Sequence, residues 1–127
     1  HRCVPFELRI ERTFSAAHAI VIQGEREPLH GHDWRVLVAV RGPQLDQEEL
    51  LCDFHAIEQQ VDGVITPFHN ANLNETAPFD QRNPTAEAIA EHLYQMLADR
   101  MPQGASLHRV EIGEAPGCTA VFGVTLD

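Results

Sequence analysis

The chain has 127 residues, 43% of them hydrophobic, which is the size of a single compact domain with one buried core. We therefore expect one domain over residues 1–127. Nine Lys and Arg residues against 19 Asp and Glu residues give a formal net charge of −10. Because no segment concentrates basic residues, the sequence disfavours a nucleic-acid partner and favours a small molecule. A secretion signal and the roughly 20 apolar residues of a membrane span are both missing, which predicts a soluble, cytoplasmic protein with no membrane partner.

Period-two patterns near both ends of the chain predict strands. From Phe6 to His18 apolar residues alternate with charged ones, and the pattern repeats from about His32 to Arg41. The first two strands are expected to pair. Two shorter segments of β-type composition, Leu107 to Ile112 and Thr119 to Thr125, are separated by a run rich in glycine and proline at 113–117.

The middle of the chain predicts two amphipathic helices. Asp53 is suited to cap the first helix, whose apolar stripe has spacings of three and four: Phe54, Ile57, Val61 and Ile65. Asn83 and Pro84 supply an N-cap and a first-turn proline for the second, which should end near residues 102–104. Strands at both ends with helices between them predict an α+β fold of order β-β-α-α-β-β, an antiparallel sheet with two helices on one face.

Histidine is the most unusual component, with eight residues in the chain. His30 and His32 are separated by one residue at the start of an extended segment, so their rings project on one face. His18 ends the neighbouring predicted strand on the same parity and can join them. Three neutral imidazoles leave zinc an open position. From spacing alone, a His-x-His pair that binds no metal is commoner than one that binds a metal. The third histidine reduces this difference in favour of a metal site.

These motifs resemble a known family. Residues Phe14-Ser15-Ala16-Ala17-His18 and Leu29-His30-Gly31-His32 are similar to the zinc signature of 6-pyruvoyltetrahydropterin synthases, a family that includes 6-carboxytetrahydropterin synthase of queuosine biosynthesis. The resemblance continues in order through Asp53-Phe54, Asn72-Leu73-Asn74, Asn83-Pro84-Thr85-Ala86-Glu87 and Glu114. It implies Zn²⁺ held by His18, His30 and His32. It also implies the tunnelling fold and a homo-oligomer, commonly a hexamer of two stacked trimers with active sites between protomers.

The resemblance further implies a reduced pterin, such as dihydroneopterin triphosphate, as substrate. Glu114 matches a glutamate that anchors the pterin ring in relatives, and a carboxylate can accept two parallel hydrogen bonds from an aminopyrimidine edge. Thr85 and Glu87 match positions that line the pterin pocket at a helix N-terminus, where backbone N–H groups are free. Without the resemblance, Glu114 reads as an ordinary loop acid and the other two as capping residues.

The catalytic base is left open by two departures from the family. Relatives that make pyruvoyl- or carboxy-pterins place a cysteine four residues before the HGH motif, where Arg26 stands here. One branch uses a glutamate instead and releases a hydroxymethyl pterin, so Glu25 and Glu27 are candidate bases, with solvated loop acids as the alternative. The usual Asp-His pair reads His69-Asn70, so His69 is a candidate acid or base that needs another partner to orient it.

The sequence therefore predicts a zinc-dependent carbon–oxygen lyase acting on a pterin triphosphate. One alternative is a zinc- and pterin-binding homologue that has lost or changed this reaction. Another is a structural metal site closed by a fourth protein ligand, Glu or His. A cupin is disfavoured because it needs more strands and no central helix pair. Cys3, Cys52 and Cys118 have no CxxC spacing and are interpreted as packing or incidental residues.

Overall fold

The computed structural model describes residues 4–124, so the predicted strand end at Thr125, like Cys3, lies outside the described residues. The elements in chain order are β1 (Phe6–His18), β2 (Val21–Ile22), β3 (Glu25–Arg26), β4 (His30–Gly42), α1 (Phe54–Ile65), the 3₁₀ helix η1 (Thr66–Phe68), β5 (Ala71–Asn72), η2 (Leu73–Glu75), α2 (Ala86–Leu97), β6 (Ser106–Ala115) and β7 (Cys118–Gly123). The long elements follow the predicted order, and the short ones were not predicted. No helix within residues 4–124 has the length and apolar character needed to cross a membrane.

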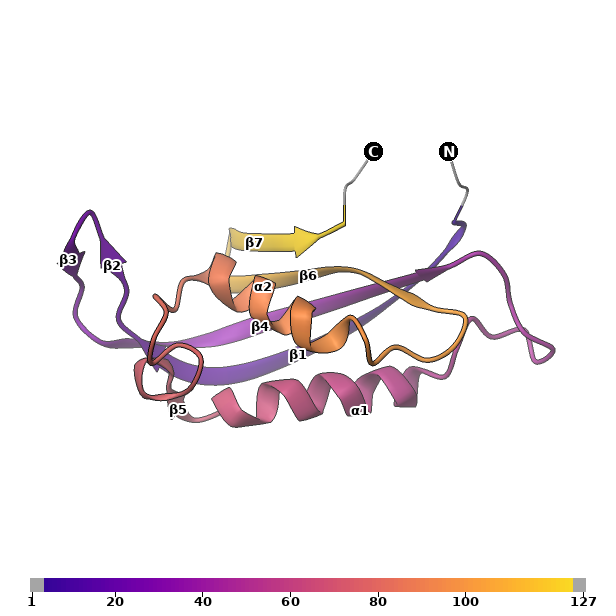
Figure 1. Ribbon diagram of the computed structural model, residues 1–127, viewed down its shortest axis with the longest axis horizontal. Coiled ribbons are helices and arrows are strands. Elements are labelled where there is room, and N and C mark those ends of the chain that lie inside the picture. Colours follow the sequence, from indigo (N-terminus) through magenta and orange to yellow (C-terminus); the bar gives the residue numbers. More distant parts are fainter. Residues whose placement is uncertain (1–3, 125–127) are drawn as a thin grey trace.

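The strands form one main sheet in the order β5-β1-β4-β6-β7. The four long strands are antiparallel, while the two-residue β5 runs parallel to β1. β1 and β4 pair without a register shift from Phe6 with Gly42 to His18 with His30. Both helices lie on the same face of the sheet, and the small β2–β3 hairpin extends beyond the end of β1 (Figure 1). The predicted α+β arrangement is therefore confirmed.

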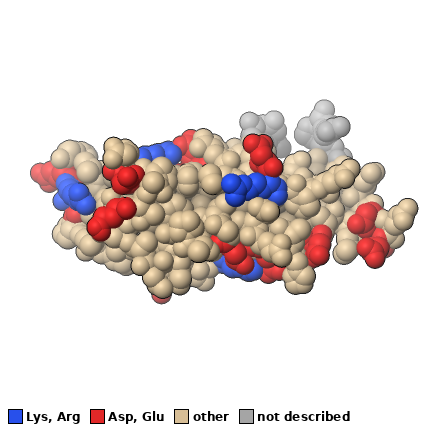
Figure 2. All heavy atoms as spheres, turned by 60° about the horizontal axis from the view of Figure 1, so that its bottom comes forward, with Lys and Arg blue, Asp and Glu red and all other residues tan. Residues whose placement is uncertain are grey.

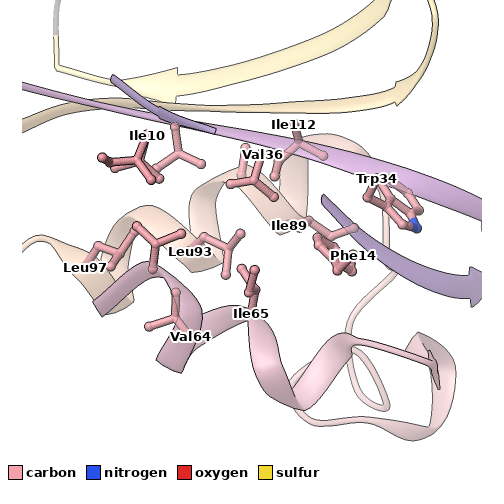
Figure 3. Close-up of a cluster of buried hydrophobic side chains, with 14 of the residues drawn as sticks. Ile10, Phe14, Trp34, Val36, Val64, Ile65, Ile89, Leu93, Leu97 and Ile112 are labelled. Atoms are coloured by element: carbon pink, nitrogen blue, oxygen red, sulfur yellow. The ribbon is translucent and has the colours of Figure 1, made fainter. Parts of the chain in front are cut away.

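The core fills the space between the sheet and the helices. Side chains from alternate strand positions, such as Ile10 and Val36, point toward Leu93 and Leu97 of α2 (Figure 3). Removing one such side chain from the core typically costs about 2–5 kcal/mol. Trp34 is fully buried at the end of this core that lies beside the histidines, and its indole N–H donates to the backbone oxygen of Ala16 at 3.2 Å. Tight packing therefore supports the strand ends that carry His18 and His32.

Ion pairs attach α1 to the sheet. Arg12 of β1 contacts Glu58 at 2.7 Å and Asp62 at 2.8 Å, both on α1. Figure 2, which turns this side of the molecule forward, shows acidic side chains scattered over the surface and arginines that lie apart from one another. Because these pairs are open to solvent, their charges are screened and each contributes little to the free energy of unfolding.

Two predictions about the helix starts need correction. Asp53 caps α1 as predicted, accepting the backbone N–H of His55 at 2.9 Å, but Phe54 is 48% exposed and Val64 takes its place in the buried stripe. α2 is capped by Thr85 and not by Asn83, since the Thr85 side chain accepts the N–H of Ala88 at 3.0 Å. Asn83 is a residue type that favours helix caps, but its side chain forms hydrogen bonds with the backbone of Val21.

Two predicted boundaries also shift. α2 ends at Leu97, before the predicted 102–104. Pro102 disfavours helical geometry at Met101, so it sets an outer limit to the helix but does not determine the end at Leu97. β6 continues to Ala115, so Glu114 lies in a strand and not in a loop. Only the last part of the run 113–117 turns, with Gly117 at φ 83°, a conformation that glycine adopts without strain.

Candidate metal centre and adjoining cavity

The pairing of β1 with β4 brings the three predicted histidines together. His18 lies opposite His30, and His32 lies opposite Ala16, two residues along the same strands. One ring nitrogen from each histidine lies within 4.8 Å of the others. The ring centroids are 4.7 Å apart for His18 and His30, 5.2 Å for His18 and His32, and 4.7 Å for His30 and His32. Three imidazoles that converge in this way can hold a metal ion.

Hydrogen bonds orient two of these rings. Nδ1 of His18 lies 2.8 Å from the backbone oxygen of Pro84, and Nδ1 of His30 lies 2.9 Å from that of Pro28. Because a carbonyl oxygen only accepts, each Nδ1 carries the proton and each Nε2 keeps a free lone pair. The buried Nε2 atoms of His18 and His32 have no hydrogen-bond partner within the described chain. Since unpaired buried nitrogens are costly, this donor set fits a metal ion.

The surroundings keep His32 neutral. Burial lowers the pKa of His32, and the nearby His18 and His30 lower it further, while Glu114 acts in the opposite direction. The edge contacts of Trp34 with His18 and His32, with centroids at 4.8 and 5.2 Å, place an apolar wall behind the rings. Neutral imidazole is the form that binds metals.

Two carboxylates lie at the rim of the histidine cluster. Oε1 of Glu114 is 3.7 Å from Nε2 of His18, and its Oε2 is 4.0 Å from Nε2 of His32. Oε1 of Glu27 is 3.7 Å from Nε2 of His30. Glu25 is exposed in the β2–β3 hairpin and forms no ion pair with the histidines in the described part of the chain. The structure thus brings Glu27, and not Glu25, to the cluster.

A cavity of about 630 Å³ adjoins the histidines at Glu114. Its lining comes from three segments: Ile20, Val21 and Ile22; Thr85, Ala86 and Glu87; and Glu114, Gly117, Cys118, Thr119 and Ala120. All the residues predicted to bind a pterin therefore surround one space, between an apolar wall and the N-terminus of α2. Its size and mixed lining are typical of small-molecule sites.

His69 lies apart from this cavity. Its Nδ1 accepts the backbone N–H of Ser15 at 3.2 Å, and the next residue, Asn70, donates its own N–H to the oxygen of Ser15 at 2.6 Å. Within residues 4–124 it does not line the cavity and makes no ring contact with the three histidines. A backbone amide thus orients the ring in place of an aspartate. Because Nδ1 accepts, neutral His69 carries its proton on Nε2.

Two residues have positions that the sequence did not predict. Cys118, expected to pack or to be incidental, is exposed and lines the cavity. Asn83, expected to cap α2, forms hydrogen bonds with the backbone of Val21. No periodic pattern in the sequence around either residue predicts these contacts, because they are made with segments distant in the chain. Cys52 is buried, and burial raises the pKa of its thiol, which agrees with a packing role.

Comparisons with known proteins identify the family. Residues 7–124 match the family model described as 6-pyruvoyl tetrahydropterin synthase. The chain belongs to this family. The 6-pyruvoyl tetrahydropterin synthase family consists of enzymes that act on pterins. The chain is 29% identical over 126 residues to the 6-carboxy-5,6,7,8-tetrahydropterin synthase of Bacillus subtilis, covering 92% of this chain and 84% of that protein. A proposed 6-carboxy-5,6,7,8-tetrahydropterin synthase of Archaeoglobus fulgidus is 30% identical over 105 residues, covering 83% and 84%.

Solved structures of family members confirm the tunnelling fold. The 6-pyruvoyl tetrahydropterin synthase of Caenorhabditis elegans superposes with a TM-score of 0.79 at 20% identity, over 98% of this chain and 100% of that chain. A Plasmodium vivax 6-pyruvoyltetrahydropterin synthase, in which a glutamate described as a catalytic residue is replaced by alanine, gives 0.76 at 19% identity, over 95% and 98%.

Proposed function

We propose that this chain is a zinc-dependent lyase that acts on a reduced pterin such as dihydroneopterin triphosphate. The observation that carries this proposal is the junction of two features at Glu114. On one side are three converging histidines, two of them with buried Nε2 atoms that have no hydrogen-bond partner among residues 4–124, and on the other is a cavity of about 630 Å³. Family membership supports a pterin as the ligand of that cavity.

His18, His30 and His32 would hold Zn²⁺ through their Nε2 atoms. Zinc bound there would act as a Lewis acid toward the side-chain oxygens of the pterin. The carbonyl groups of Pro84 and Pro28 keep two of the rings in the tautomer that presents Nε2 to the metal. The apolar wall formed by Trp34 excludes water from the back of the cluster.

In this proposal Glu114 binds the pterin ring. Its carboxylate can accept two parallel hydrogen bonds from a ring N–H and the adjacent amino group. Thr85 already accepts the N–H of Ala88, and its hydroxyl can still donate to a ligand. Glu87 lies in the first turn of α2 on the same cavity and can accept further pterin N–H groups.

Glu27 is the proposed base. The proposed reaction breaks the carbon–carbon bond between the first and second side-chain carbons, and not the carbon–oxygen bond expected from the sequence. A base removes the proton of the second hydroxyl, and the second carbon becomes that of an aldehyde as the bond breaks. The electron pair stays on the carbon attached to the ring, which takes up a proton to give a hydroxymethyl pterin. Glu27, 3.7 Å from His30 Nε2, can accept the first proton. The catalytic glutamate of the P. vivax relative is a precedent for this residue type in the same fold.

We further propose that His69 serves the site of a neighbouring copy in a homo-oligomer, a hexamer of two stacked trimers. In support, His69 lies apart from the cavity of its own chain, while its Nε2 proton is available for donation. This role predicts mixed oligomers in which a chain with His69→Gln and a chain with Glu27→Gln restore activity to each other. Light scattering would give the number of copies.

A second candidate is a zinc- and pterin-binding homologue without the original reaction. Arg26 stands where relatives carry their catalytic cysteine, which favours this candidate. A structural metal site is a third candidate, because Glu114 lies 3.7 and 4.0 Å from two Nε2 atoms and a small movement would make it a fourth ligand that closes the site. Glu114 would then be unavailable to a pterin ring.

The deciding experiment is incubation of zinc-loaded protein with dihydroneopterin triphosphate and identification of the pterin products by mass spectrometry. Glu27→Gln is compared with Glu25→Gln, the same change two residues away on the exposed hairpin. We expect a hydroxymethyl pterin, abolished by Glu27→Gln and retained by Glu25→Gln. A carboxy product would instead indicate the reaction of queuosine biosynthesis. Pterin binding without any product would support the second candidate.

A further inference from the structure

Side chains that replace a neighbouring strand hold the three residues that follow β1: Ala19, Ile20 and Val21. The last two line the cavity. Asn74 accepts the N–H of Ala19 at 2.7 Å and donates to its carbonyl oxygen at 2.8 Å. Asn83 does the same for Val21, with both distances 2.9 Å. A primary amide offers one acceptor and two donors, so it can mimic a peptide group in a strand pair.

The opposite edge of this segment has a different partner. Successive residues of an extended chain direct their N–H and C=O groups to alternate edges, so Ile20 faces away from the two asparagines. Its N–H donates to Oε1 of Glu27 at 3.2 Å, and its carbonyl oxygen accepts the N–H of Glu27 at 3.0 Å. Asn83 therefore holds Val21 at a point that is separate from the contacts of Glu27.

The wall that Asn83 holds is weak by itself. β2 and β3 have two residues each, and an isolated two-stranded hairpin is marginally stable at best. Val21 is 46% and Ile22 55% exposed, so packing within the chain does not fix them either. Asn83 also precedes Pro84, whose carbonyl oxygen orients His18, and Thr85, which caps α2 and lines the cavity. Through Asn83 the hairpin wall is attached to the loop that orients the metal ligand.

We propose that Asn83 is a positioning residue that fixes the width of the cavity by holding its apolar wall. The identity of the ligand as a pterin rests on the proposed function, but the hold on the wall does not. Within residues 4–124 the side-chain hydrogen bonds of Asn83 go to Val21 and not to His18, so loss of the clamp should weaken ligand binding and leave metal binding intact. Because Ile20 and Ala19 keep their own partners, Glu27 should stay in place.

The test compares zinc-loaded Asn83→Asp and Asn83→Ala with Gln81→Glu, an amide-to-carboxylate control at an exposed position in the same loop. Hydrogen exchange is followed by mass spectrometry in peptides covering residues 19–27. Asn83→Ala removes both hydrogen bonds to Val21 and predicts about tenfold faster exchange there. Asn83→Asp can still accept the N–H of Val21 and loses only the bond to its carbonyl oxygen, so a smaller increase is expected. For dihydroneopterin triphosphate we expect KM to rise about tenfold with kcat nearly unchanged, and zinc content to stay at the wild-type level.

Several outcomes would overturn the proposal. Unchanged exchange in both Asn83 variants would show that Val21 is held by something else. A KM effect in Asn83→Asp but not in Asn83→Ala would indicate repulsion of an anionic substrate and not loss of a clamp. Parallel loss of zinc would indicate general disruption. A wild-type protein that neither binds nor converts the pterin would count against the proposed function, while the exchange rates would still decide whether Asn83 holds the wall.

Discussion

The polar side chains at the two ends of β1 differ in whether they have polar partners within the chain. Near the start of β1, Glu7 contacts Arg41 of the adjacent β4 at 2.7 Å, Arg109 of β6, one strand further, at 3.3 Å, and Arg9 on its own strand. At its other end, the fully buried His18 leaves Nε2 without a hydrogen-bond partner in residues 4–124. Polar groups that satisfy one another stabilise the fold, whereas buried groups left unsatisfied indicate that something else binds them.

His108 shows the limit of this argument. It is also buried, and its Nε2 also has no hydrogen-bond partner among the described residues. Burial lowers the pKa of His108, and Arg41 and Arg109 lower it further, so its ring is neutral. No second or third metal-ligating side chain joins it in the described chain. Convergence of several unpaired nitrogens, and not one unpaired nitrogen, therefore distinguishes a candidate metal site.

The largest effect is expected from removing a histidine of the cluster. His18→Ala should weaken zinc binding by more than about 100-fold, because loss of supporting groups alone costs about 10–100-fold. Trp34, the single tryptophan of the chain, has its ring centroid 4.8 Å from that of His18, so its fluorescence can follow a zinc titration. His108→Ala is the matched control and should bind zinc like the wild type. Equal zinc affinity in all three proteins would contradict the comparison.

An intermediate effect is expected at the other end of β1. Partial burial by itself would raise the pKa of Glu7, but hydrogen bonds from Arg41, Arg9 and Arg109 outweigh it and lower the pKa from 4.5 to about 2. The ionised carboxylate thus stabilises the fold above about pH 4.5, and this contribution is lost as the pH falls toward 2. Glu7→Gln should cost about 2 kcal/mol at pH 7, allowing for the exposed partners.

Urea unfolding of Glu7→Gln at pH 7 and at progressively lower pH checks this prediction. The difference from wild type should shrink as the pH approaches 2. Glu11→Gln, at an exposed position on the same strand, is the control and should change stability little at any pH. A constant difference across the whole range would show that the network acts through packing and not through charge.

The smallest effect is expected at the cap of α2. Thr85→Ala removes the acceptor for the N–H of Ala88 and should lower the free energy of unfolding by about 1 kcal/mol. Thr85→Ser keeps the hydroxyl and should stay close to the wild type. Chemical denaturation measures both. If Thr85→Ala leaves the free energy of unfolding unchanged, the cap does not stabilise α2, and Thr85 contributes only to the lining of the cavity.

The sequence by itself determined the long elements and the three histidines. Period-two alternation in β1 and β4 predicts strands because alternate side chains meet the core, and spacings of three and four predict the helices for the same reason. These patterns are local, so they can be read without knowing the fold. The sequence also predicted that His18 would lie with His30 and His32. Side chains alternate between the two faces of a strand, so counting along each strand shows that all three point to the same face.

Tertiary structure decided what depends on contacts between distant residues. Glu25 and Glu27 differ little in sequence, but only Glu27 lies 3.7 Å from His30, because of the register of the small hairpin. Asn83 is of a residue type that often caps helices, but its side-chain amide forms hydrogen bonds with the backbone of Val21, 62 positions away in the chain. A polar side chain can form a hydrogen bond with a helix end, with another side chain or with a distant backbone segment, and the fold decides which of these lies within hydrogen-bond distance. Local sequence does not contain that distance.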